Sequence, residues 1–259
     1  YYDWGSQRVR GPAGFKGYEL DAGGGVNGGV FVGEHDGTPL VMIAIRGSEV
    51  SLRDWLRNFS AATVPVDWRA VGMSLARMHR GYRNAVYALQ LQITAAIKGI
   101  DLDRAVFIVT GHSAGAGIAD GVTDWLLSWK VNKIPRVRLY TFGQPPVWAK
   151  KHGQILRRYR VLHVDDAVPS MRLPLFGAHH VEMPSAHPLA PYVAGAYLIR
   201  ADRSIHATTS TAASAEHAAR LTLEFWRWPS RFGQRFVSHR MDGYRDRFRE
   251  LDAEGVEFI

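Results

Sequence analysis

The chain has 259 residues, of which 46% are hydrophobic and 22% charged, a balance typical of a soluble globular fold with one sizeable core. It contains no cysteine, which excludes disulfides, thiolate nucleophiles and Cys-ligated zinc. No apolar run reaches the roughly 20 residues that span a bilayer, so no transmembrane segment is expected.

The formal net charge is +8, which favours contact with anionic surfaces. Its arginines are spread along the chain without a nucleic-acid-binding motif, so we interpret them as solvated surface charge and expect no nucleic-acid partner. Residues 1–4 lack the basic and apolar regions of a signal peptide, so the sequence neither indicates nor excludes export. The length favours a single domain over residues 1–259.

The first predicted elements form a hairpin. Extended segments at 30–32 and 39–45 flank His35-Asp36-Gly37, whose Asp-Gly pair favours a tight turn. The glycine-rich stretch at 23–29 lacks the Lys-Ser/Thr of a phosphate-binding loop, so we interpret it as a turn before a strand.

Helices and strands then alternate along the chain. Apolar residues recur at helical spacing over 81–97, and a helix from the glycine-rich turn near 113 to Lys130 is expected after a strand that begins at Val106. Further strands are predicted at 137–142 and 160–164, and a late helix at 211–226. This alternation predicts an α/β fold, a mostly parallel central sheet with helices on both faces.

The most specific motif is Gly111-His112-Ser113-Ala114-Gly115, which follows the strand at Val106. A serine between two such glycines, at a strand-to-helix turn, is the pattern of a strained elbow that exposes a nucleophilic hydroxyl. A serine hydroxyl needs a neutral imidazole to take its proton and a carboxylate to orient that imidazole.

Candidates for the acid and the base follow in the expected order. Asp165 and Asp166 come directly after the strand at 160–164, and His239 is the late histidine candidate. His206 and His217 compete with it but lie in a stretch without a motif. The chain order Ser, Asp, His is that of α/β-hydrolases.

Two groups are candidates for an oxyanion hole. Ala114, the residue after the nucleophile, supplies one backbone N–H, and Ser48 offers a second donor in the Gly-Ser turn after the strand at 39–45. The histidines of the chain show no zinc-ligand spacing, so no metal site is expected.

Six segments in order along the chain resemble those of the class 3 (fungal-type) lipases. They are Ile43–Ser48 with Asp54-Trp55 and Asn58, His79–Tyr82, the elbow at 111–115, Tyr140–Pro145, Asp166–Pro169 and His239–Tyr244. The resemblance implies an α/β-hydrolase fold and cofactor-free hydrolysis of carboxylic esters, most directly of acylglycerols or related lipids. It also implies Ser113 as nucleophile, Asp166 rather than Asp165 as acid, His239 as base, and Ser48 with Ala114 as oxyanion hole.

The family also places a mobile lid after the oxyanion loop. In this chain Leu52, Trp55, Leu56 and Phe59 form an apolar stripe at helical spacing within 51–60. The segment is either a lid over the acyl groove, with peripheral contact to a lipid interface, or a fixed helix on the core. The longer connection at 171–199 is a candidate cap over the site.

Some features depart from the family or leave alternatives open. Ala114 is smaller than the usual aliphatic residue, which leaves more room in an acyl pocket, and the lack of disulfides favours a bacterial or intracellular relative. Phospholipase A1, monoacylglycerol lipase and aryl or feruloyl esterase use the same core. An acyltransferase and a non-catalytic binding module with a lipase fold also remain open.

Overall fold

The computed structural model describes residues 2–3, 8–9, 11–23, 27–47, 63–68, 76–128, 136–149, 157–163, 168, 194–199 and 205–208. Its strands are β1 (Tyr2–Asp3), β2 (Arg8–Val9), β3 (Lys16–Asp21), β4 (Asn27–His35), β5 (Thr38–Ile45), β6 (Thr63–Pro65), β7 (Arg77–His79), β8 (Val106–His112), β9 (Val137–Phe142), β10 (Arg157–His163), β11 (Ala194–Ile199) and β12 (Ile205–Thr208). The described helices are α2 (Arg80–Ala96) and α3 (Ala114–Ser128).

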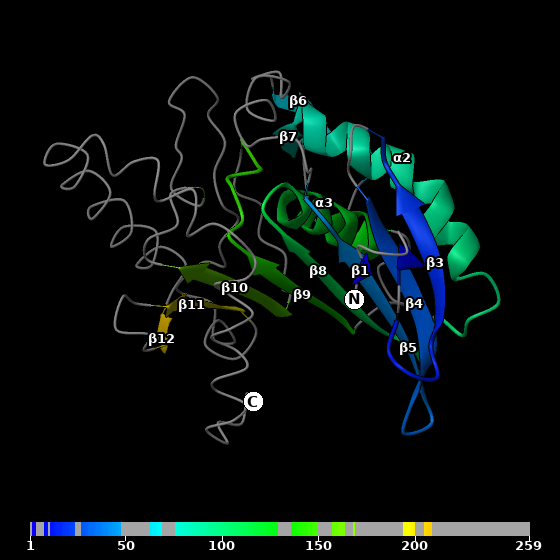
Figure 1. Ribbon diagram of the computed structural model, residues 1–259. Coiled ribbons are helices and arrows are strands. Elements are labelled where there is room, and N and C mark those ends of the chain that lie inside the picture. Colours follow the sequence, from blue (N-terminus) through cyan, green and yellow to red (C-terminus); the bar gives the residue numbers. More distant parts are fainter. Residues whose placement is uncertain are drawn as a thin grey trace, which may run out of the picture.

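The centre of the structure is an eight-stranded sheet in the order β12-β11-β10-β9-β8-β5-β4-β3 (Figure 1). The five strands from β5 to β11 in this order pair in parallel, and the outer strands β12, β4 and β3 pair antiparallel. The pairs β1-β2 and β6-β7 form separate two-stranded sheets. The expected mostly parallel α/β sheet is therefore confirmed.

The predicted hairpin is present between β4 and β5. Asp36 and Gly37 both have positive φ, 49° and 71°, as a two-residue turn between right-twisted strands requires. Part of the stretch interpreted as a turn belongs to β4 instead. A β-carbon at Gly28 would overlap the carbonyl oxygen of Ala44 on β5, so glycine there permits close pairing of the two strands.

The helix predicted over 81–97 is confirmed as α2. His79 caps its start, and its buried residues recur every three or four positions: Tyr82, Val86, Leu89, Ile93 and Ala96. They join β5, β8 and β9 side chains in one apolar cluster with α3, so both described helices cover the same face of the sheet (Figure 1). The late helix predicted at 211–226 lies outside the described residues.

The two helices approach each other through glycines. A β-carbon at Gly117 of α3 would lie 2.7 Å from Cε1 of Tyr82, and one at Gly121 would lie 2.8 Å from Cγ2 of Val86, both on α2. Because α3 lies between α2 and the sheet, every residue from 114 to 126 is buried. A helix buried from 114 to 126 holds its start, and therefore residue 113, in a fixed position.

Several boundaries differ from the sequence prediction. β10 begins at Arg157 rather than at 160, whereas the predicted end of α3 at Lys130 lies outside the described residues. The segment 171–199, a candidate cap, contributes its last six residues to the central sheet as β11, whereas the rest lies outside the described residues. Within the described part of the chain, no helix is long and apolar enough to cross a bilayer.

Candidate active site

Ser113 stands at the turn between β8 and α3. Its φ is 58°, and apart from Asp36 no other described non-glycine residue has a positive φ. Holding a side-chain-bearing residue in this region costs about 1–3 kcal/mol, and such strain is found where the surrounding structure imposes it. The serine predicted as nucleophile therefore occupies the strained elbow that its motif indicates.

The two motif glycines explain how so sharp a turn fits. A β-carbon at Gly111 would overlap the carbonyl oxygen of Gly115, and one at Gly115 would overlap that of Ile45. Both neighbours are backbone atoms, which have no rotamer to change. Glycine at both positions is required for β8, α3 and the end of β5 to approach one another.

Backbone hydrogen bonds fix the elbow on both sides. The Ser113 N–H donates to the carbonyl oxygen of Phe142 at the end of β9 (3.0 Å), and its own carbonyl accepts from the N–H of Ala116 (3.0 Å). The Ser113 N–H is thus engaged within the sheet. In contrast, the first N–H of a helix has no acceptor within that helix, which leaves the Ala114 N–H available to an oxyanion.

Gly47 brings the end of β5 against this elbow. A β-carbon on Gly47 would lie 3.0 Å from the carbonyl oxygen of His112, 3.3 Å from Cβ of Ser113 and 3.4 Å from the backbone nitrogen of Ala114. Gly47 therefore lies directly beside Ser113 and Ala114, the predicted nucleophile and the predicted first oxyanion donor. Ser48 itself lies outside the described residues.

The predicted acid follows a strand that ends at the same edge of the sheet. β8, β9 and β10 are parallel, and β10 ends at His163, three residues before Asp166. Ligands bind beyond the carboxyl ends of such strands. Asp166 and His239 lie outside the described residues, as do the stripe residues Leu52, Trp55, Leu56 and Phe59, so their roles stay predictions.

His79, in one of the family-like segments, has a structural role at the start of α2. Its Nδ1 accepts the N–H of Gly81 (3.3 Å), and its ring lies 5.3 Å from that of Tyr82. Burial lowers the pKa of His79 to about 4, so the neutral imidazole that can accept this bond persists at neutral pH.

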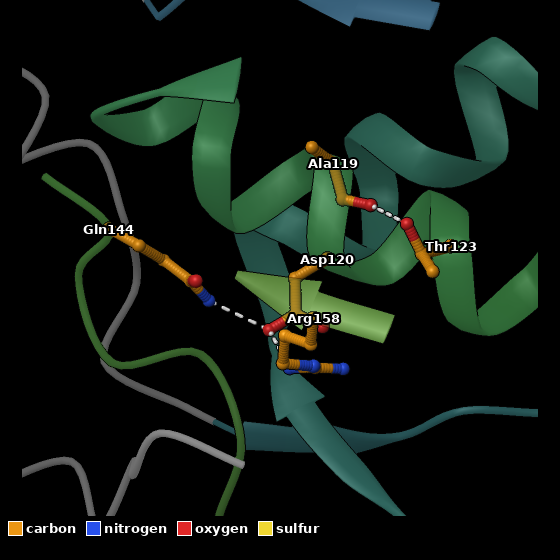
Figure 2. A network of polar contacts seen from close by, with 5 residues as sticks. All are labelled: Ala119, Asp120, Thr123, Gln144 and Arg158. Carbon is orange, nitrogen blue, oxygen red and sulfur yellow. Dashed lines mark hydrogen bonds and ion pairs between the residues drawn. The ribbon is translucent and has the colours of Figure 1, made fainter. Parts of the chain in front are cut away.

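A set of buried polar residues beneath the elbow is absent from the sequence prediction. Asp120 Oδ2 accepts from Gln144 Nε2 (2.7 Å) and from Arg158 Nη1 (2.8 Å) (Figure 2). Asp124, one turn further along α3, accepts from Trp68 Nε1 (2.9 Å). Burial raises the pKa of Asp124 to about 7, the Trp68 hydrogen bond lowers it, and the nearby Asp120 charge raises it.

In the sequence, the buried polar set is indicated by Asp120 and Asp124, two carboxylates four residues apart in a helical segment made mostly of small and apolar residues. Such a pattern puts both on one side of the helix, but it does not show what they meet. Elsewhere in the described part of the chain, no three histidine or acidic side chains gather as metal ligands would.

The parallel sheet, the strained serine between β8 and α3 and the adjacent Gly47 together define the α/β-hydrolase fold. Residues 42–176, just over half of the chain, match the class 3 lipase family, and the chain belongs to that family.

Known proteins agree with this fold. The secreted mono- and diacylglycerol lipase 1 of Fusarium solani is 28% identical over 159 residues, which cover 59% of this chain but only 45% of that relative. The Rhizomucor miehei triacylglyceride lipase superposes with a TM-score of 0.54 at 20% identity, over 77% of this chain and 72% of its own. Lipase II from Rhizopus niveus gives 0.57 at 17% identity, over 76% and 71%.

Proposed function

We propose that the protein is a serine carboxylic-ester hydrolase that acts on acylglycerols or related lipid esters through an acyl-enzyme on Ser113. The observation that carries the proposal is the elbow, where a serine with φ of 58° starts a buried helix beside Gly47. Such strain has a use where a hydroxyl must be presented to a substrate.

The remaining roles are assigned from the family resemblance and the chain order. The His239 imidazole takes the Ser113 hydroxyl proton as Oγ attacks the ester carbonyl carbon, and Asp166 orients that imidazole. The Ala114 N–H and Ser48 stabilise the oxyanion. The C–O bond to the alcohol then breaks, and the alcohol takes the proton from His239. In the second half of the reaction, water gives a proton to His239 as it attacks the acyl carbon. The bond to Ser113 Oγ then breaks, Oγ regains the proton from His239, and the acid leaves.

Lipid substrates are supported by the relatives and by the charge. The Fusarium protein is named for mono- and diacylglycerols and the Rhizomucor protein for triacylglycerides. A net charge of +8 attracts a protein to anionic lipid surfaces, and the apolar stripe at 51–60 suits a lid that opens there. We therefore include peripheral contact with a lipid interface in the proposal.

The test compares hydrolysis of p-nitrophenyl esters with acyl chains of two to sixteen carbons and of emulsified acylglycerols. Ser113→Ala is expected to lower kcat by about 10⁴-fold or more, since loss of a triad serine in a protease costs about a millionfold. Ser128→Ala is the matched control, because that hydroxyl donates to the Trp125 carbonyl at the far end of α3. It is expected to keep wild-type activity.

Each other outcome would count against a stated part of the proposal. Wild-type protein without activity on any ester would contradict the enzyme. Activity that persists in Ser113→Ala would contradict the nucleophile. A maximum at short chains without a gain at the emulsion would replace the lipid substrate by a soluble ester.

A further inference from the structure

Asp120, Gln144 and Arg158 form a buried cluster below the elbow, which we name the positioning cluster. Asp120 is fully buried, Gln144 is 1% exposed and Arg158 is 7% exposed. A single carboxylate oxygen, Oδ2 of Asp120, accepts the hydrogen bonds of both partners, and the bond from Arg158 is charge-assisted (Figure 2). Because all three side chains are buried, these contacts lie in the low-dielectric interior, where small displacements change their energy steeply.

Each member stands on an element that leads to the proposed site. Asp120 lies two turns, about 10 Å, along α3 from Ser113. Gln144 lies on the loop after β9. The carbonyl of Phe142, the last residue of β9, accepts the Ser113 N–H, and the Gly143 N–H in the loop donates to the Val161 carbonyl on β10. Arg158 lies on β10, which ends three residues before Asp166. The carboxylate thus joins the nucleophile helix, the loop beside it and the strand that precedes the acid.

Stability alone does not account for this arrangement. A buried ion pair replaced by apolar side chains of similar volume is often as stable or more stable, because burial removes both charges from water. What apolar side chains do not supply is direction, since hydrogen bonds fix both distance and angle between the groups they join. The distinct contribution of the positioning cluster is the placement of α3 relative to β10.

We propose that Asp120, through Gln144 and Arg158, is a positioning residue that fixes Ser113 relative to β10, the strand that precedes the proposed acid Asp166. The inference rests on the proposed function, because it concerns the geometry of that site. Asp120 touches neither substrate nor reacting atoms. Its effect is on how closely Ser113, His239 and Asp166 align.

The test is the triple variant Asp120→Leu/Gln144→Leu/Arg158→Met, which removes all three polar groups and leaves no charge unpaired. We expect kcat to fall by about 10- to 100-fold with KM within about twofold, because a misplacement of about 1 Å costs that much in rate. The rate of Ser113 labelling by a fluorophosphonate is expected to fall by the same factor. Thr123→Val, a buried polar change one turn away on α3, is the control that keeps kcat.

A folded triple variant with wild-type kcat and labelling rate would overturn the inference and reduce the cluster to a structural role. If the triple variant does not fold, Asp120→Asn replaces it, since it keeps the shape and one acceptor oxygen but loses the charge. Its kcat is expected to fall by about three- to tenfold with KM unchanged, and wild-type kcat in that variant would equally overturn the inference. Wild-type protein that neither hydrolyses esters nor labels would contradict the proposed function itself.

Discussion

The first turn of α3 is placed by the absence of side chains, whereas its middle is held by buried charged and polar side chains. At the start of the helix, Gly111 on β8 and Gly115 on α3 let three backbone segments meet, because neither residue has a β-carbon. Two turns later Asp120 and Asp124 each accept hydrogen bonds from residues on other elements. One helix therefore relies on close backbone contact where the chemistry is proposed and on directed bonds where it is anchored.

The two regions tolerate change differently. Close backbone contact fails when a single methyl group is added, because neither backbone segment has an alternative conformation nearby. Removing one partner of a buried polar cluster lowers the stability of the fold, because it leaves a buried polar or charged group unpaired. Removing all partners together costs little stability. The elbow is thus sensitive to volume, and the interior of the helix is sensitive to unmatched charge.

The largest effect is expected for Gly115→Ala, whose β-carbon would overlap the Ile45 carbonyl oxygen and lie 2.8 Å from the Gly47 nitrogen. We expect about 3 kcal/mol or more of destabilisation in urea, and about a 100-fold loss of ester hydrolysis per folded molecule as β5 is pushed from the elbow. The control is Gly14→Ala, where φ is 82° but nothing lies within 4 Å. For Gly14→Ala we expect only the backbone strain of about 1 kcal/mol as a loss of stability, with ester hydrolysis unchanged.

Wild-type stability and activity in Gly115→Ala would show that the elbow does not depend on this approach. A similar activity loss in Gly14→Ala would show that strain anywhere in the chain has the same effect, and the comparison between regions would fail.

The same contrast explains which features the sequence could predict. The elbow, the Asp36-Gly37 hairpin and α2 are local patterns, in which the residues that determine the structure stand within a few positions of one another. The mostly parallel pairing, seen in β5, β8, β9 and β10, followed from the alternation of strands and helices.

The features that were missed depend on distant partners. Asp120 bonds residues 24 and 38 positions away, and Asp124 bonds one 56 positions away, so spacing along the chain carries no trace of either contact. β3 was missed because its pattern, Lys16-Gly17-Tyr18-Glu19-Leu20-Asp21, buries only one side chain fully. β11 was missed because it ends a Pro- and His-rich stretch with little strand character.

A smaller and pH-dependent effect is expected for Asp124→Asn. The pKa of Asp124 is about 7 in the folded protein, against the ordinary value of 3.8 that applies to the unfolded chain. Between these two pH values the folded state therefore binds more protons than the unfolded chain. The free energy of unfolding therefore falls as pH rises from about 4 to about 7 and then levels off. An asparagine does not titrate and keeps an acceptor oxygen for Trp68.

Relative to wild type, Asp124→Asn should gain about 2 kcal/mol of stability between pH 5 and pH 8, measured by urea denaturation at both. His79 has the opposite effect, because its lowered pKa removes stability as pH falls from 6.5 to about 4, but it is present in both proteins and cancels in the difference. Asp36→Asn, at a 90% exposed position, is the control. An equal difference between variant and wild type at the two pH values would contradict the assignment.

The smallest effect is expected for Thr123→Val. Thr123 is as buried as Asp120, but its hydroxyl donates to the Ala119 carbonyl one turn back on the same helix (2.8 Å; Figure 2), and the helical N–H already satisfies that carbonyl. Valine has nearly the same shape, so urea unfolding should change by no more than about 1 kcal/mol with an unchanged m-value. If urea unfolding of Thr123→Val and of Asp120→Asn, measured side by side, showed the same loss of stability, any buried polar group on α3 would matter equally. The bonds from Asp120 to β10 and to the loop after β9 would then have no special role, and the anchoring of the helix would have to be sought in its packing against α2.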